Sequence, residues 1–367
     1  MTPSSSSRKA STKARGKVAP QKAADQSRGI AELDSLFAMA GLTRHRRGKP
    51  AGITHRLRME RAMPHELQRP APKPRVAVNG VHWLDVPAWR RMGWLWHGFS
   101  TRKGGLSRAY CPEDAPGELN LGFTAADDRE TVLRNRRLFA EAITGSADTP
   151  LVPLRQVHSN VVVVATAADF GLNPPRKGDG IITGEPGLLL AVQTADCIPV
   201  LVADRKQRVV AAFHAGWRGT VKRIVETGIG RMRLEFGSHP EDLVAAIGPG
   251  IGPCCYSVGE EVLSAFESQF AYARKLFHEV YDSDPIRTKY PMLFLTQRAP
   301  GHSPIGPSLH LDLIEANRRQ LLDTGLKPRA ISVTGGCTNC QRELFFSHRG
   351  SRGHAGRMMG VIGIRPH

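Results

Sequence analysis

Apolar residues gather into short runs that predict a series of buried strands. Compact runs lie at residues 161–165, 188–192, 200–202 and 209–213, and each has the length of a strand covered on both faces. Segments with the apolar spacing of helices lie between groups of such runs, but strands and helices do not alternate in a regular βαβ repeat. The pattern therefore favours an α+β protein with a mixed β-sheet core flanked by helices.

Three stretches show the three- and four-residue spacing of amphipathic helices. Residues 220–236 place Val221, Val225, Ile229 and Met232 on one face. A second helix is expected at residues 313–324, ended by the following glycine. A shorter helix is expected within residues 30–40. We predict one catalytic domain, residues 81–367, behind an N-terminal extension, residues 1–80.

Charge separates the extension from the domain. Residues 1–80 contain 17 Lys and Arg but 5 Asp and Glu, a net charge of +12 out of +18 for the whole chain. A segment so basic and so poor in apolar side chains is expected to be largely disordered. It could contact nucleic acid or acidic lipid through phosphates. The absence of interleaved aromatic residues favours a solvated extension instead.

The composition also indicates the cellular compartment of the protein. No apolar run approaches the roughly 18–20 residues that a spanning helix requires, so no membrane partner is expected. Six cysteines in 367 residues are too sparse for a disulfide scaffold. We therefore expect a soluble protein of the reducing cytoplasm. Its oligomeric state is left open.

Reactive residues are concentrated where strand-like runs end. The sequences Gln-Val-His at 156–158, Thr-Ala-Asp-Cys at 194–197 and His-Ala-Gly-Trp-Arg-Gly at 214–219 are three such places. Imidazole and thiolate are preferred ligands of Zn²⁺, and three protein ligands leave one position for water or substrate. Spacing alone leaves a second interpretation open, in which one cysteine and two histidines are core residues.

The same stretches belong to a longer ordered set of motifs. This set resembles the YfiH family, long labelled laccase-domain or multicopper polyphenol oxidase and assigned to purine nucleoside phosphorolysis. The similar segments are residues 97–105, 119–122, 127–128, 135–136, 156–158, 179–180, 194–197, 214–219, 246–251, 337–338, 345–347 and 356–357.

The resemblance implies a metal site and an activity. The family places zinc, with copper as the alternative, on positions that correspond to His158, Cys197 and His214. It implies the conversion of adenosine and phosphate to adenine and ribose 1-phosphate, a glycosyl transfer. Inosine, guanosine and methylthioadenosine are further expected substrates, with adenosine deamination as a side activity. Cys197, His214 and Arg218 are then the expected catalytic residues.

Physical chemistry suggests roles for several polar side chains near these motifs. Arg102 and Arg218 are candidates for phosphate contact, because a guanidinium group offers two parallel donors to an oxyanion. Asn120 is a candidate for binding the ribose or shaping the pocket. Asp196 precedes Cys197, so it could support the metal site, contact substrate or cap a turn. The sequence does not identify a general acid.

The remaining cysteines are not expected to form a second site. Cys254 and Cys255 are adjacent, and adjacent cysteines rarely bind one metal together. Cys337 and Cys340 supply two ligands, whereas a structural zinc needs four. We therefore expect these residues to be packing thiols.

Three rival functions are considered. A polyphenol oxidase needs clustered copper-binding histidines, and none of the fourteen histidines forms a His-x-His pair, which disfavours it. A cysteine hydrolase or amidase would use Cys197 as nucleophile and His214 as base, with peptidoglycan precursor editing as one role linked to the family. A non-enzymatic domain tethered to RNA by the basic extension is the third alternative.

Overall fold

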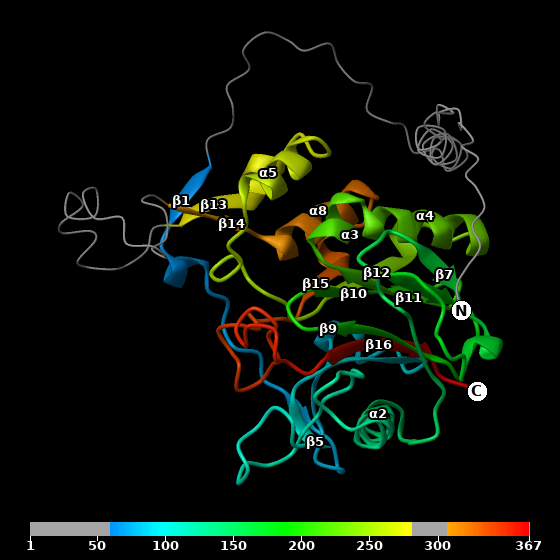
Figure 1. Ribbon diagram of the computed structural model, residues 1–367. Helices are drawn as coiled ribbons and strands as arrows, with labels where there is room; N and C mark the ends of the chain where they lie inside the picture. Colours follow the sequence, from blue (N-terminus) through cyan, green and yellow to red (C-terminus); the bar gives the residue numbers. More distant parts are fainter. Residues whose placement is uncertain (1–58, 281–306, 367) are drawn as a thin grey trace, which may run out of the picture. The chain divides into compact units, whose positions relative to one another are not determined.

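The computed structural model describes residues 59–280 and 307–366, whose strands form three sheets (Figure 1). The first six-stranded sheet has the order β15-β12-β10-β11-β8-β7. Its strands, in that order, are Ile331–Val333, Leu243–Ile247, Ile198–Asp204, Val209–Ala215, Gly180–Thr183 and Val162–Val164.

The second six-stranded sheet has the order β2-β3-β4-β16-β9-β6. Its strands are Arg75–Val76, His82–Leu84, Leu95–Ser100, Met358–Ile364, Leu189–Thr194 and Leu151–Pro153. Both sheets are mixed: β12 and β15 are parallel, as are β7 and β8 and also β6 and β9, whereas the other pairs are antiparallel. The α+β fold with a mixed sheet core is therefore confirmed.

The two sheets are stacked face to face, and their strands alternate between two cores. In β10, Leu201 and Ala203 contribute to the core between the sheets, whereas Val200 and Val202 face the helices. Neighbouring residues of a strand point to opposite faces, and both faces are covered here. This double coverage explains why the strands appear in the sequence as continuous apolar runs.

Helices cover the outer faces of this pair of sheets. Residues of α4 (Ile224–Phe236), α5 (Glu260–Glu267) and α8 (Leu313–Asp323) pack on the first sheet, and α3 (Trp217–Val221) lies beside α4. The long α2 (Arg129–Thr144) packs on the second sheet through Phe139 and Ala140. Figure 1 shows the resulting order of layers, with α2 on the opposite side from α3 and α4.

The predicted helix at 220–236 is in fact two helices. Arg223, between α3 and α4, has φ 63°, a left-handed conformation that interrupts the helical backbone. The amphipathic spacing continues across this break, so periodicity could not reveal it. The helix predicted at 313–324 is confirmed as α8. The pattern did not predict α2 or α5.

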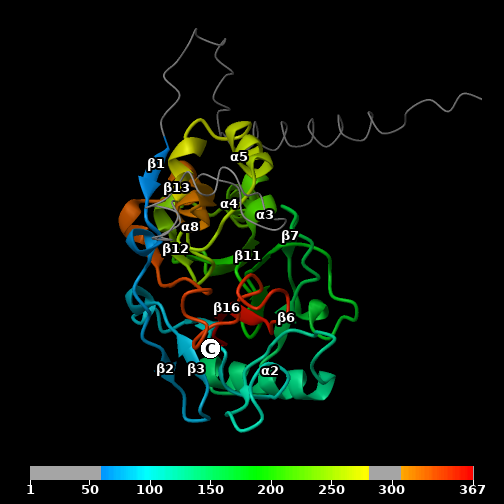
Figure 2. The same cartoon turned by 60° about the vertical axis from the view of Figure 1, so that its left-hand side comes forward.

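A third sheet includes a strand that precedes residue 81. Its order is β1-β13-β14, with bounds Glu60–Ala62, Phe277–Val280 and Ser308–Leu311 (Figure 2). The short helix η1 (Pro64–Leu67) follows β1, and Gln341 donates a hydrogen bond to the carbonyl of Arg69. Within the predicted extension, β1 thus pairs with the distant strand β13, and β2 pairs with the neighbouring strand β3. The rest of the predicted extension lies outside the described residues.

Among residues 59–280 and 307–366, no helix combines the length and apolar character needed to cross a bilayer.

Candidate metal and catalytic site

The three predicted ligands lie where the chain passes from one sheet to the other. His158 lies in the connection from β6 of the second sheet to β7 of the first. Cys197 ends the connection from β9 to β10, which also joins the second sheet to the first. His214 is the penultimate residue of β11, directly opposite Pro199 in the ladder with β10. The stacking of the sheets therefore brings three distant segments together.

The ligand atoms of His158, Cys197 and His214 all lie within 4.8 Å of one another. The Cys197 sulfur is 3.8 Å from Nε2 of His158, and the two imidazole rings meet edge to face with centroids 4.9 Å apart. His214 is buried, whereas His158 and Cys197 are accessible to solvent. A small molecule can therefore approach the group from the solvent side.

A buried carboxylate holds two of these ligands in position. Asp179 precedes β8, and its side chain accepts a hydrogen bond from Nδ1 of His214 at 2.9 Å. It also accepts the backbone N–H groups of Val157, His158 and Ser159 at distances of 2.7–3.2 Å. Because Nδ1 donates to the carboxylate, Nε2 of His214 is left for a metal.

Cys197 and His214 stabilise each other's charged forms. Burial raises the pKa of the Cys197 thiol, but the nearby His214 and His158 outweigh burial and lower it to about 6. Burial lowers the pKa of His214, but the Cys197 thiolate and the Asp179 carboxylate outweigh it and raise the value to about 9. Without a metal, the pair is therefore a thiolate and an imidazolium near neutral pH.

The arrangement fits a three-ligand zinc site. Two imidazoles and one thiolate are ligands of the type that Zn²⁺ prefers, and one of the imidazoles is oriented by a carboxylate. The backbone of Gly216 also lies close to two of the ligands: a Cβ on this residue would be 2.8 Å from the Cys197 sulfur and 3.0 Å from Cδ2 of His158. The glycine of the His-Ala-Gly-Trp sequence is thus required for the close approach.

Asp196 supports the backbone beside Cys197. Its φ of 94° is a strained conformation for a non-glycine residue. Its carboxylate accepts hydrogen bonds at 2.7 Å from the Thr338 hydroxyl and from the Arg349 backbone N–H. Both oxygens of Asp196 are therefore engaged by the C-terminal part of the domain, which favours a positioning role over substrate contact.

Arg102 and Asn120 are also engaged by the protein. The Arg102 guanidinium pairs with Glu118 at 2.7 Å and stacks over Phe346. The buried amide of Asn120 donates to Asp127 and to the Gly122 carbonyl, and its oxygen accepts from backbone N–H groups. The sequence suggested phosphate contact for Arg102, and ribose contact or shaping of the pocket for Asn120. This geometry favours structural roles for both.

Arg218 remains available for a ligand. Its side chain is exposed and stacks over the neighbouring Trp217, with 4.5 Å between the guanidinium carbon and the ring centroid. Its charge acts on Tyr256, as do the charges of Cys197 and Asp196, so these groups share one electrostatic environment. Within residues 59–280 and 307–366, no hydrogen bond or ion pair engages the Arg218 guanidinium, whereas Arg102 is paired with Glu118.

Sequence reasoning missed three residues around the site. Asp179 was part of a recognised motif, but no role was assigned to it. Burial is the largest effect that raises the pKa of Tyr256, and the Cys197 thiolate raises it further. Arg349 stacks over Tyr256 and binds Ser257. An aspartate directly before the strand Gly-Ile-Ile-Thr was the one signal available for Asp179, and none marked Tyr256 or Arg349.

The four cysteines that were expected to be packing thiols lie together in one group. The sulfurs of Cys254, Cys255, Cys337 and Cys340 all lie within 4.8 Å of one another. All six cysteines of the chain are free thiols in the structure. Folding places together two pairs that lie far apart in the sequence, and Cys254 and Cys337 also pack with Ile251 in a small buried apolar cluster.

Taken together, the stacked mixed sheets and the two-histidine, one-cysteine group define an α+β protein with a solvent-accessible metal-binding type of site. A family model described as "Multi-copper polyphenol oxidoreductase laccase" matches residues 96–365. The chain belongs to this family, which includes the YfiH proteins recognised from the sequence motifs.

Similar proteins cover almost the whole of this domain. The purine nucleoside phosphorylase of Bacteroides thetaiotaomicron is 33% identical over 273 residues, covering 73% of this chain and 91% of that protein. The Escherichia coli protein named purine nucleoside phosphorylase YfiH is 33% identical over 282 residues, covering 76% and 98%. The crystal structure of the Bacillus licheniformis hypothetical protein YfiH has a TM-score of 0.64 at 30% identity, covering 80% and 99%.

The first prediction concerns the pH dependence of zinc binding. A metal must displace the proton that the raised pKa of about 9 keeps on His214, whereas Cys197, with a pKa of about 6, has already lost its proton above neutrality. Zinc affinity should therefore rise about tenfold per pH unit from about pH 7 to pH 9 and then level off. Chelator competition in a variant lacking the four-cysteine group measures this slope. A flat profile would contradict the charged pair.

The second prediction concerns Asp179. Asp179→Asn removes the carboxylate that orients His214 and gathers three backbone N–H groups, so zinc affinity should fall about 10–100-fold. Asp204→Asn is the matched control, because Asp204 is equally buried and accepts the backbone N–H groups of Lys206 and Gln207. Equal zinc affinity in the two variants, measured by competition with a chromophoric chelator, would exclude this role.

Proposed function

We propose that this protein is a zinc-dependent purine nucleoside phosphorylase of the cytoplasm. The proposal depends on one observation: His158, Cys197 and His214 converge within 4.8 Å at a place that solvent reaches. The names of the relatives that match nearly their full length support phosphorolysis. Adenosine is the proposed substrate, with inosine, guanosine and methylthioadenosine as further substrates and adenosine deamination as a side activity.

Phosphorolysis exchanges one bond at the anomeric carbon for another. A phosphate oxygen forms a bond to C1′ of the ribose as the bond from C1′ to the purine nitrogen breaks. The electron pair of the broken bond passes to the purine, which takes up a proton. Because the sugar carries positive charge in the transition state, the site must hold the phosphate anion close to C1′.

The zinc ion, bound by His158, Cys197 and His214, would supply Lewis acidity and orient an oxygen of the substrates. Asp179 keeps the Nδ1 proton of His214 in place, so the ring presents Nε2. Asp196, Arg102 and Asn120 act as positioning residues, since their polar groups are bound within the protein. Arg218 is the proposed phosphate contact, because it is exposed and its donors bind no other residue in the part of the chain that the structure describes.

Two rival chemistries are less well supported. The description of the family implies copper oxidation, but the two candidate metal groups among the described residues contain only two histidines between them. A cysteine hydrolase is favoured by one observation, the thiolate–imidazolium pair of Cys197 and His214. Bound zinc would occupy both of those side chains, so metal dependence separates hydrolase from phosphorylase.

The third prediction tests the reaction and its metal together. The full chain, incubated with adenosine and phosphate, should release adenine and ribose 1-phosphate, with inosine as the product of any deamination. Dialysis against a chelator should abolish adenine release, and added Zn²⁺ should restore it. Cys197→Ala should lose both the metal of this site and the activity, and Cys111→Ser, which changes a cysteine outside both metal groups, is its control.

Activity that survives the chelator, or that increases after metal removal, would reject zinc-dependent phosphorolysis and favour the hydrolase. Adenine formed together with free ribose in the absence of phosphate would identify hydrolysis instead. Full metal content in Cys197→Ala would reject the assignment of this ligand.

The fourth prediction concerns Arg218. Arg218→Ala should raise the KM for phosphate about 10-fold or more with a smaller change in the KM for adenosine, because a charge-assisted bidentate contact contributes about 1.5–3 kcal/mol. Arg233→Ala, at an exposed arginine in the last turn of α4, is the matched control. Equal effects on both KM values, or an effect equal to that of the control, would contradict phosphate contact.

A further inference from the structure

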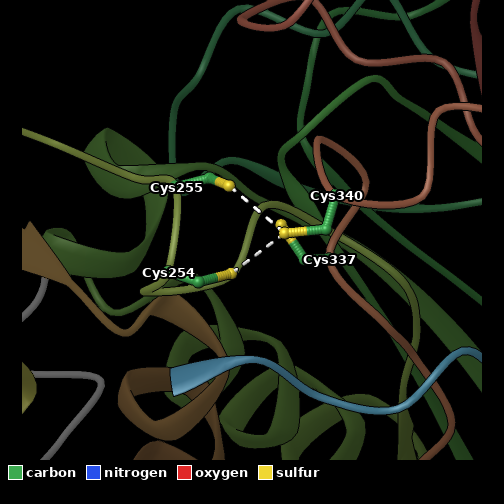
Figure 3. A group of neighbouring side chains, drawn as sticks. All are labelled: Cys254, Cys255, Cys337 and Cys340. Atoms are coloured by element: carbon green, nitrogen blue, oxygen red, sulfur yellow. Dashed lines mark hydrogen bonds between the residues drawn. The ribbon is translucent and has the colours of Figure 1, made fainter. Parts of the chain in front are cut away.

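Four cysteines outside the proposed active site form a compact group of sulfurs. They come from two parts of the chain, Cys254 with Cys255 and Cys337 with Cys340. Figure 3 shows the four side chains directed toward one another, with the Cys340 sulfur between those of Cys254 and Cys255. The Cys340 sulfur is 3.5 Å from that of Cys254 and 3.4 Å from that of Cys255.

Sheet topology explains why these two segments meet. The strands β12 and β15 are parallel neighbours, and Ile247 lies opposite Val333 at their carboxyl ends. The first cysteine pair follows β12 and the second follows β15, so both pairs lie beyond the carboxyl ends of these parallel strands. A bridge between Gly250 and Cys337 and a hydrogen bond from Thr338 N–H to the Gly250 carbonyl at 3.0 Å join the segments.

The sulfur spacing matches metal ligation and does not match disulfides. Four thiolates at about 2.3 Å from one tetrahedral zinc lie about 3.8 Å apart. A disulfide would require about 2.0 Å. The measured distances of 3.4 and 3.5 Å, and the limit of 4.8 Å for the whole group, agree with the tetrahedral arrangement.

The surroundings of the sulfurs are suited to thiolates. The backbone N–H of Gly252 donates to the Cys337 sulfur at 3.3 Å. A Cβ on Gly252 would lie 3.2 Å from Cβ of Cys337 and 3.3 Å from the Cys254 sulfur, so glycine permits the close packing. Cys254 and Cys337 are buried, whereas Cys340 is exposed, which gives a metal a path of entry.

We propose that Cys254, Cys255, Cys337 and Cys340 bind one Zn²⁺ as a tetrahedral four-thiolate structural site. All four coordination positions are filled by protein, so the site is closed to substrate and has no direct part in catalysis. This inference stands apart from the proposed function, because it concerns different ligands and different segments of the chain.

The position of the group indicates what a structural metal would stabilise. Thr338, next to Cys337, donates to the carboxylate of Asp196, and the Ile251 N–H donates to the Asp196 carbonyl at 2.8 Å. Both cysteine segments are therefore tied to the residue that precedes Cys197. A metal that links these segments would hold the strained turn at Asp196 and, through it, the position of Cys197.

The fifth prediction is tested by the metal content of the purified full chain. Cys340→Ser replaces the exposed ligand and should lower the zinc content by about one equivalent per chain relative to Cys111→Ser, the matched control at a cysteine outside both groups. In a Cys197→Ala background, added Co²⁺ should give the intense visible bands of a tetrahedral thiolate complex. Those bands should be lost in Cys197→Ala/Cys340→Ser.

A second measurement uses the unmutated protein, so it does not depend on the folding of a variant. Alkylation followed by mass spectrometry should find the four cysteines protected as isolated and labelled after treatment with a chelator, with Cys111 as the internal reference. Equal zinc in Cys340→Ser and Cys111→Ser, disulfides among the four cysteines, iron in place of zinc, or labelling unaffected by the chelator would overturn the proposal. These readouts do not involve nucleosides, so failure of phosphorolysis would leave them interpretable.

Discussion

The carboxylate of Asp179 is the interaction on which the candidate site depends. A fully buried negative charge requires compensation, and here backbone N–H groups of residues 157–159 and the ring of His214 provide it. These hydrogen bonds hold the pKa of Asp179 well below its usual range. One anion therefore fixes two ligands from separate segments, and it orients the second of them for a metal.

The sheets determine where this anion can act. The central strands of both sheets are covered on both faces, and the polar groups of the site come from strand ends and from the connections between the sheets. His158 and Cys197 lie in such connections, and His214 lies at the end of its strand. The same constraint places the four-cysteine group beyond the parallel strands β12 and β15. The two proposed metal sites are thus products of one architecture, linked through the hydrogen bonds of Asp196.

The charged pair of Cys197 and His214 makes the chemistry depend on what occupies the site. Without a metal, a thiolate beside an imidazolium has the charge distribution of an activated nucleophile. With zinc bound, both side chains become ligands and the imidazolium proton is released. The proposed function therefore depends on whether Cys197 and His214 bind a metal, which the chelator experiment tests.

The sequence by itself determined four of the central strands, β7, β9, β10 and β11, as well as the α+β class and the identity of the three candidate ligands. Apolar runs identify doubly covered strands because burial acts on every residue of such a strand, and the motifs around His158, Cys197 and His214 are local. Only the tertiary structure decided that Arg102 and Asn120 are bound within the protein, that Asp179 orients His214, and that Cys254 and Cys255 meet Cys337 and Cys340. The physical reason is that hydrogen bonding and ligation depend on distances of a few ångströms between segments distant in sequence. Neither periodicity nor spacing along the chain encodes such distances.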